Sequence, residues 1–370
     1  MPIRRPSNND GDFMARKMDK RLLEMEASIS NIYEQASEEA TRKLERFLGQ
    51  YEEQNNIMQA RLLEGEITRE EYQIWLQTNL LKKQKYEELI NSLTDVAVNA
   101  DITAMSVRDG ELPLILAQSF NFTQFVGNLI AEDTGLSVGT FQIYNTRTVQ
   151  ALLNENPQLL PVVNIPIDQR WNSNHINRAI TQGIIQGDSM DGIARRLQTV
   201  YTMDSNAAIR NARTATTAAE NYGRNQSYEY LRENGIDIRK KWNAVMDNRT
   251  RDTHLLLNDT LPNEQGYFGE GILDPDNLMK FPADPNGLPE ERYNCRCRLD
   301  IIEPQFTRAV NEQNYARWMQ ENYPDDWRQV QEYDNRKGGA NDQRRQAEER
   351  IPVARERVEE RLRRRAEEKE

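Results

Sequence analysis

Apolar residues recur at steps of three and four through the first part of this chain, and this spacing limits what the chain can fold into. Leu22, Met25, Ile29 and Phe47 belong to one such series, which runs from residue 13 to about residue 56 with Glu, Lys and Arg between them. The spacing places the apolar side chains on one face of a helix. Because such a helix is stable only when that face packs against neighbours, the pattern predicts long, paired helices.

A break and a new helix start follow this series. The break is at Glu64-Gly65, and Thr68 then precedes Glu71 by three residues. In a capping box, the Thr hydroxyl accepts a hydrogen bond from the Glu backbone N–H, while the carboxylate accepts one from the Thr backbone N–H. We therefore predict a helix that starts after Thr68 and turns Tyr72 toward a core.

Proline and glycine interrupt the next part of the chain. Residues 101–170 contain Pro113, Pro157, Pro161 and Pro166, together with several glycines. Proline removes a backbone donor and clashes with the preceding helical turn. We therefore predict short helices and irregular connections in this part.

Three helical segments are predicted between residues 171 and 235. They are Trp171 to Gly187, then Met190 to Val200 with Asp188 or Ser189 as its cap, and then a long helix from Asp204-Ser205 to about Asn234, with Gly235 as the residue after its end. The last of them carries a polar row made of Arg210, Arg213, Thr214, Thr217, Asn221 and Arg224. This row is either a solvated stripe or a surface that touches the segment around residues 247–251 or a phosphate.

The spacing changes from helical to alternating after Gly235. Residues 236–242 alternate apolar and charged side chains, which indicates a strand, and residues 295–302 indicate another. Thr250 stands where it could cap a short helix, and residues 259–294 are expected to form a long structured loop. These patterns predict an α+β, predominantly α-helical protein with long N-terminal helices, a small mixed C-terminal domain and a charged tail.

Four parts follow from this organisation: a flexible arm at 1–12, a helical region at 13–168, a mixed domain at 169–303 and a polar, charged tail at 304–370. The chain has a net charge of −11, so a DNA contact would need a local basic stripe. No apolar run is long enough to span a bilayer, and the N-terminus lacks the apolar stretch of a secretory signal. We expect synthesis in a reducing cytoplasm and no membrane partner.

His254, Cys295 and Cys297 are the residues best suited to bind a metal. If residues 295–302 form a strand, both cysteines point to the same face, and with His254 they could supply three ligands to zinc. The fourth ligand could be Asp247, Asp252 or a water. The alternative is that His254 is a hydrogen-bonded core residue, that the cysteines are small apolar fillers, and that no cofactor is bound.

An enzymatic alternative uses the same residues. Cys295 or Cys297 could act as a nucleophile with His254 as base, oriented by Asp247, in a self-processing hydrolase. Asp247, Asp252 and His254 could instead bind a divalent metal for phosphodiester hydrolysis in a nuclease. The sequence has no P-loop, dinucleotide fingerprint or serine elbow. We favour a structural role and expect that the protein is not an enzyme.

The arginines on either side of Thr250 fit that structural role. Arg249 and Arg251 could hold the long loop by pairing with its acidic residues, for which the candidates are Asp274, Asp276 and Asp284. The cluster would then be a network of acid, guanidinium and imidazole groups that keeps a coil-rich region in one shape.

These residues also carry a resemblance to a known family. The chain reads D-x-R-T-R-x-x-H, P-x-D-P and N-C-R-C at a set of positions that comprises Asp247, Arg249, Thr250, Arg251, His254, Asp284, Asn294, Cys295 and Cys297. This combination resembles the phage Mu F-like minor head (head morphogenesis) family. The chain departs from the family at Ala215, where an acidic residue is common, at Asp259, where Gly is common, and at Arg251 and His254, where many relatives have C-x-x-C.

The resemblance implies a late structural protein of phage head assembly. Such a protein would bind the portal protein through the helical region 13–168, and it would also meet the major capsid or scaffolding protein. It would lie in the virion, inside the capsid near the portal vertex, after assembly in the host cytoplasm. The basic stretch at 361–366 could then contact packaged DNA during storage or ejection.

Overall fold

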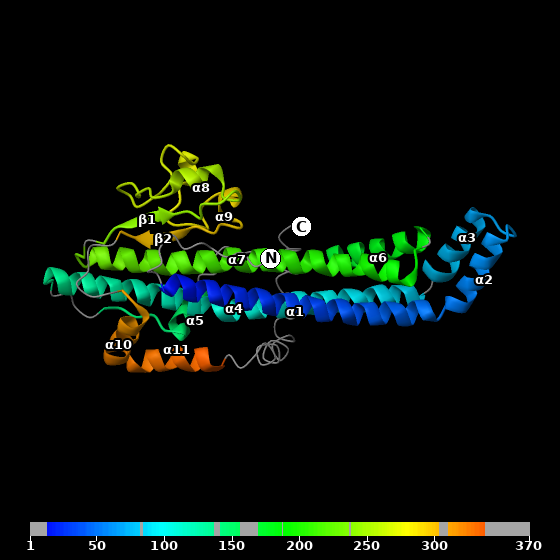
Figure 1. Cartoon of the computed structure of the whole chain (residues 1–370), viewed down its shortest axis with the longest axis horizontal. Coiled ribbons are helices and arrows are strands. Elements are labelled where there is room, and N and C mark those ends of the chain that lie inside the picture. The colour runs from blue at the N-terminus through cyan, green and yellow to red at the C-terminus, as the bar shows by residue number, and fades with distance from the viewer. Residues whose placement is uncertain are drawn as a thin grey trace. The chain divides into compact units, whose positions relative to one another are not determined.

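The computed structural model describes residues 13–81, 84–136, 141–155, 169–186, 188–236, 238–302 and 310–336. These residues are mostly α-helical, and the sheet among them has two strands (Figure 1). The prediction of a predominantly α-helical α+β fold is confirmed. Among the described helices, none combines the length and the apolar character of a membrane span. The predicted arm at 1–12 and the charged stretch at 361–366 lie outside the described residues.

Helices make up most of the element order. The elements are α1 (Phe13–Gly49), α2 (Glu52–Leu63), α3 (Arg69–Leu76), the π-helix η1 (Gln77–Leu81), α4 (Gln84–Thr134), α5 (Thr146–Glu155), α6 (Gln169–Gln186), α7 (Met190–Glu233), β1 (Lys240–Asn243), α8 (Asp252–Leu257), the 3-10 helix η3 (Pro275–Asn277), α9 (Pro289–Arg292), β2 (Arg298–Ile301), α10 (Glu312–Asn322) and α11 (Pro324–Arg336).

The described chain divides into two compact units. Unit 1 contains residues 13–26, 107–155 and 210–336, and unit 2 contains residues 27–106 and 169–209. The predicted boundaries at 168 and 303 stay predictions. In unit 2, the predicted capping box is confirmed, because Thr68 Oγ1 accepts from the Glu71 N–H at 3.2 Å and the Thr68 N–H donates to Glu71 at 2.8 Å.

The prediction of short helices is wrong for residues 101–134, because α4 continues through Pro113, but it holds for α5, which has 10 residues. A proline inside a helix costs about 3 kcal/mol through its lost hydrogen bond and its clash with the preceding turn. The residues that follow it, Leu114 to Ala117, are at most 2% exposed. Burial of these side chains offsets the cost, since each contributes about 1.5–3 kcal/mol when large and apolar.

The predicted helix start at Asp204-Ser205 is also wrong, because α7 is continuous from Met190 to Glu233. Asp204 and Ser205 are buried inside it. The end of α7 agrees with the prediction: Gly235 has φ +83°, and the Ile236 N–H donates to the Leu231 carbonyl at 3.0 Å. The left-handed conformation of Gly235 turns the chain back, so that the next N–H groups can donate to carbonyls that have no partner within the helix.

Close contact between α4 and α7 in unit 1 depends on Gly223. A Cβ at this position would lie 2.4 Å from the Leu116 backbone oxygen, whereas a Cβ at Gly110 of α4 would meet nothing within 4 Å. Gly223→Ala is therefore expected to lower the free energy of unfolding by about 1–3 kcal/mol. Gly110→Ala is expected to raise it by about 0.5–1 kcal/mol through helix propensity. Urea denaturation of both variants checks this, and equal midpoints would contradict the close approach.

Two buried carboxyl groups, Asp101 and Asp204, belong to the core of unit 2. Asp101 accepts a hydrogen bond from the Tyr33 hydroxyl at 2.6 Å and from the Asn172 amide at 3.0 Å. Burial raises the pKa of Asp101 to about 7, although these hydrogen bonds lower it in part. Burial and the charge of Asp101 raise the pKa of Asp204 to about 8. Both carboxylates also raise the pKa of Tyr33 and of Tyr201, on top of the effect of burial.

These shifts predict that stability falls as the pH rises. The folded chain holds both protons more tightly than an unfolded chain, whose aspartates have a pKa of 3.8. The stability that these protons contribute is therefore fully present below the unfolded pKa of 3.8, and it is lost as the pH rises through the folded values of about 7 and about 8. Asp204→Asn mimics the protonated group, so it should raise stability by on the order of 2 kcal/mol at pH 8 and change it little at pH 4. Denaturant titrations across this range test the effect. The matched control is Asp95→Asn, an exposed site on α4, which should keep the wild-type slope.

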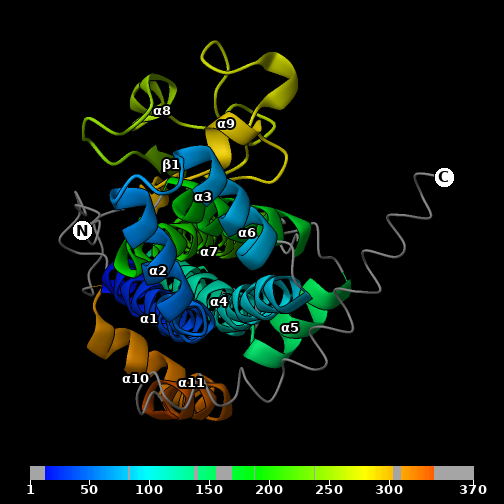
Figure 2. The same cartoon turned by 90° about the vertical axis from the view of Figure 1, so that its right-hand side faces the viewer.

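The sheet pairs β1 with β2 in antiparallel register, with Trp242 opposite Leu299. Both strands are shorter than predicted, and Cys295 and Cys297 precede β2 rather than lie in it. The N-cap of α8 is Arg251 with no side-chain cap bond, so the predicted cap by Thr250 is wrong. The loop between the strands, which carries α8 and α9, lies on the side of the strands away from α7 in both views (Figure 1 and Figure 2).

Aromatic contacts attach α10 to unit 1. The Tyr315 ring lies 5.7 Å from the Phe13 ring and 5.6 Å from the Phe125 ring, centroid to centroid. Trp318 packs against Phe125 at 5.6 Å. Trp318 is therefore one member of an aromatic cluster.

Candidate functional site

The polar row on α7 is the base of the candidate site. Thr214, Thr217, Asn221 and Arg224 are each at most 1% exposed, so the interpretation as a solvated stripe is wrong for these four residues. Arg210 is exposed, and Arg213 is half-buried and donates to Glu26 at 2.8 Å. Thr214, Thr217 and Asn221 bond to the backbone of the segment that leads into β2, a contact that neither sequence alternative included.

Asn221 makes the largest number of these contacts. Its amide donates to the carbonyls of Pro282 and Cys297 at 3.1 Å each, and its oxygen accepts the Leu299 N–H at 2.7 Å. Thr217 donates to the Cys295 carbonyl at 3.0 Å. Since irregular backbone has no ladder partners, these side chains satisfy polar groups that would otherwise be buried without a bond.

We call residues 244–297, between the two strands, the loop lobe. Two of its predicted site residues shape its turns. The Asp284 carboxylate is 1% exposed and accepts the N–H groups of Lys280 at 2.8 Å and Asn286 at 2.9 Å. Asn294 has φ +56°, a left-handed conformation that Asn adopts more readily than most residues, and its N–H donates to Thr214 at 3.0 Å.

Asp247 pairs with Arg296 rather than with the arginines beside Thr250. The Arg296 guanidinium donates to both Asp247 oxygens, at 2.6 and 2.5 Å, and Asp247 also accepts the Arg249 N–H at 3.0 Å. The Arg296 hydrogen bonds hold the pKa of Asp247 well below its ordinary value. The Thr250 hydroxyl donates to the Val245 carbonyl. A bidentate pair of this kind fixes both orientation and distance.

The predicted pairing of Arg249 and Arg251 with Asp274, Asp276 or Asp284 is wrong. The Arg249 side chain is exposed, and Arg251 donates to the Tyr293 carbonyl. Asp274 accepts the Asp276 N–H and starts η3. The partner of a guanidinium is decided by distance in the folded chain. Here the turn at 292–296 brings the Tyr293 carbonyl within hydrogen-bond distance of Arg251.

His254, Cys295 and Cys297 come together as predicted. The His254 Nδ1 lies 3.3 Å from the Cys297 sulfur and 3.7 Å from the Cys295 sulfur. All three side chains are at most 2% exposed, and both cysteines are free thiols. Within the described part of the chain, this is the group whose ligand atoms, all within 4.8 Å of one another, could hold a metal ion. The Trp242 ring packs edge-on against the imidazole at 5.4 Å.

The three groups influence each other's protonation. Burial alone would raise the pKa of Cys295, but its hydrogen bond with Cys297 and the charge of His254 bring it well below the ordinary value. The hydrogen bond with Cys295, followed by burial, raises the pKa of Cys297 well above that value. Burial lowers the pKa of His254. The charge and hydrogen bond of Cys295 have a larger opposite effect, so the pKa of His254 is raised overall.

A buried ionic network beneath the lobe was not found from the sequence. Glu220 is 0% exposed and accepts from Arg298 Nε at 2.8 Å, while Arg224 Nη2 lies 3.4 Å from the same oxygen. Arg298 also donates to Asp19 at 3.3 Å, and Arg224 donates to the Leu299 carbonyl at 3.3 Å. The spacing of Glu220 and Arg224 by four residues is the sequence signal that could have indicated it.

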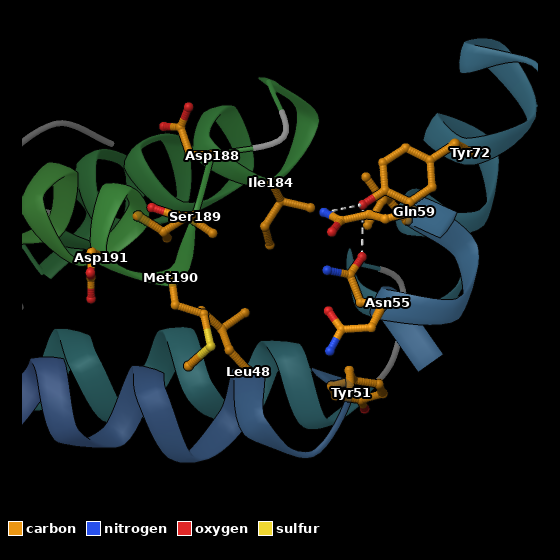
Figure 3. Close-up of a pocket in the computed structure, with 13 residues that line it drawn as sticks. Leu48, Tyr51, Asn55, Gln59, Tyr72, Ile184, Asp188, Ser189, Met190 and Asp191 are labelled. Atoms are coloured by element: carbon orange, nitrogen blue, oxygen red, sulfur yellow. Dashed lines mark hydrogen bonds between the residues drawn. The ribbon is translucent and has the colours of Figure 1, made fainter. Parts of the chain in front are cut away.

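A cavity also lies in unit 2, and its lining contains none of the predicted site residues. It has a volume of about 330 Å³ and is lined by Asn55, Gln59, Tyr72, Ser189 and Met190 among others (Figure 3). The Tyr72 hydroxyl donates to Asn55 at 2.7 Å and accepts from Gln59 at 3.2 Å, as the dashed lines in Figure 3 show.

Comparison with known proteins relates this geometry to a family. Residues 174–300 match the family described as phage Mu protein F like protein. The chain is 27% identical to minor head protein GP7 of Bacillus phage SPP1 over 190 residues, which is 49% of this chain and 59% of that protein. It is also 27% identical to NAD(+)–arginine ADP-ribosyltransferase EFV of Enterococcus faecalis over 147 residues, 40% of this chain and 29% of that protein. No solved structure gives a significant match.

The match therefore covers α7, both cysteines, His254 and the loop lobe, but less than two thirds of either relative. The segment formed by residues 174–300, which carries the candidate site, is similar to the phage Mu protein F like family.

Proposed function

We propose that this protein is a minor structural component of a tailed-phage head that acts in head morphogenesis. The observation that carries the proposal is the shared segment: the chain matches the phage Mu protein F like family over residues 174–300 and a minor head protein over 190 residues. The motif residues in this segment include Asp247, Asp284 and Asn294. They bond to backbone or to one another within the lobe, which is what a structural role requires.

The burial of the sulfur atoms favours a structural role over a catalytic one. The Cys295 sulfur lies 3.7 Å from the His254 imidazole, and a cysteine beside a base is the arrangement of a cysteine nucleophile. Yet Cys295 and His254 are each 1% exposed, so a substrate carbonyl would reach the sulfur only if the lobe opened. The similarity to the ADP-ribosyltransferase covers 29% of that enzyme, and we assign none of its activity to this chain.

Within this role, the portal protein is the partner that we propose. The protein would assemble with the portal in the host cytoplasm and stay in the virion, inside the capsid near the portal vertex. The major capsid or scaffolding protein is the competing partner. The net charge of −11 does not favour broad contact with packaged DNA.

Mass spectrometry and co-purification test the proposal. The full chain is co-expressed with the tagged portal protein of the genome that encodes it, and in parallel with the tagged major capsid protein. Elution with the portal alone is the expected result. Elution with the capsid protein alone would overturn the portal assignment but keep the head assignment. Purified virions that contain no peptides of this chain would overturn the head assignment itself.

A further inference from the structure

We propose that His254, Cys295 and Cys297 bind one zinc ion, through the imidazole Nδ1 and the two sulfur atoms, with a water molecule as the fourth ligand. The inference is independent of the proposed function, because it depends only on the three side chains and their surroundings. It assigns a metal-stabilised loop lobe to this chain.

The distances among the ligand atoms fit a tetrahedral zinc site. With zinc–sulfur bonds of about 2.3 Å and a zinc–nitrogen bond of about 2.0 Å, tetrahedral angles place a sulfur and a nitrogen about 3.6 Å apart. The His254 Nδ1 lies 3.3 Å from the Cys297 sulfur and 3.7 Å from the Cys295 sulfur. The same geometry places two sulfurs about 3.8 Å apart, and all three ligand atoms lie within 4.8 Å of one another. Little movement is needed to close the site on an ion.

The chemistry of the donors selects the metal. Two thiolates and one imidazole are the ligands that zinc prefers, whereas magnesium and calcium take oxygen ligands. Two thiolates also balance the charge of a divalent ion, while the imidazole stays neutral. A neutral site is the kind that a buried position tolerates, since an uncompensated charge there is costly. His254 and both cysteines are at most 2% exposed.

Neighbouring groups hold the ligands from outside. The His254 Nε2, on the opposite side of the ring from Nδ1, lies 3.0 Å from the Glu291 carboxylate, which itself accepts from the Thr253 hydroxyl at 2.9 Å. A carboxylate behind a ligating histidine orients the ring and strengthens it as a ligand. On the cysteine side, Thr217 and Asn221 hold the carbonyls of Cys295 and Cys297.

The ion would connect two parts of the lobe that have few backbone bonds between them. His254 comes from α8, a helix of six residues, and the cysteines come from the irregular segment before β2. Zinc binding contributes folding free energy outright when the ligands come from separate segments. The metal would therefore set the stability of the lobe rather than supply catalysis.

Metal analysis of the full chain tests the proposal. Protein produced with supplemented zinc should contain one zinc ion per chain by elemental mass spectrometry. After chelation and reloading with cobalt(II), it should show the sulfur-to-cobalt charge-transfer absorption and the visible bands of a tetrahedral site. Cys295→Ser combined with Cys297→Ser should abolish the charge-transfer band, whereas His175→Gln, which changes the other histidine of the chain, should keep it.

A matched pair on α9 tests the outer group without removing a ligand. Glu291→Gln should weaken zinc affinity by about 10- to 100-fold, and Glu290→Gln, at an exposed neighbouring position, should leave it unchanged. The zinc content and the cobalt spectrum of the wild-type protein test the proposal by themselves, so the test does not depend on whether a variant folds. Wild-type chain without stoichiometric zinc and without the cobalt charge-transfer band, or with a Cys295–Cys297 disulfide after purification under reducing conditions, overturns the proposal.

Discussion

Glu220→Leu is expected to lower the free energy of unfolding by about 3–5 kcal/mol, because it leaves two buried guanidinium groups short of a negative charge. Glu220 accepts from Arg298 at 2.8 Å and faces Arg224 at 3.4 Å. Arg224 is 1% exposed and Arg298 is 6% exposed, so water cannot replace the carboxylate without opening the core. Denaturant unfolding followed by far-UV circular dichroism measures the loss.

Two further variants control this experiment. Glu233→Leu changes an exposed carboxylate in the last turn of the same helix, and its effect should stay within about 0.5 kcal/mol. Glu220→Gln keeps the size of the side chain and loses the charge, so its effect on the free energy of unfolding should lie between those of Glu220→Leu and Glu233→Leu. This variant replaces Glu220→Leu in the comparison if the leucine variant does not fold. Equal unfolding midpoints for Glu220→Leu and Glu233→Leu would show that the network does not stabilise the fold.

Asn221→Ala is expected to cost about 3 kcal/mol, because it removes the partners of three buried backbone groups at once. The carbonyls of Pro282 and Cys297 lose a donor, and the Leu299 N–H loses its acceptor. A buried polar group left without a bond costs about 1–3 kcal/mol. The loss should be local to the loop lobe and β2, since Asn221 bonds to both.

Amide hydrogen exchange gives the sharper readout for this variant. The Leu299 N–H should exchange much faster in Asn221→Ala, while amides in unit 2 keep their wild-type rates. Asn206→Ala is the matched control, because Asn206 is an exposed residue of the same helix and alanine favours the helix there. Unchanged protection of Leu299 would mean that the side chain does not carry the contact between α7 and the strand.

The sequence predicted the features that depend on near neighbours in the chain. The spacing of Leu22, Met25 and Ile29 indicated a buried helix face, and all three are at most 8% exposed. The capping box at Thr68 and the left-handed Gly235 are likewise decided within a few residues. Each of these signals is local, because it concerns hydrogen bonds and contacts within one or two turns.

The errors came where packing overrode a local signal. Pro113 normally ends a helix, but burial of the residues after it keeps α4 continuous. Asp204-Ser205 has the form of a helix start, yet both residues lie inside α7. In each case the free energy gained from apolar contacts exceeds the local preference of one or two residues.

At the candidate site, the sequence indicated that His254 would meet Cys295 and Cys297, because the chain has few residues with such chemistry. The sequence did not indicate which arginine would form an ion pair with Asp247. Arg249 is two residues away and Arg296 is 49 residues away, but the turn before β2 brings Arg296 to 2.5 Å. Likewise, only the tertiary structure decided that Thr217 and Asn221 face the backbone of the lobe rather than water. The sequence alone does not say which group a polar side chain will bond to. That partner is decided by packing, because buried polar groups in the folded chain must find hydrogen bonds.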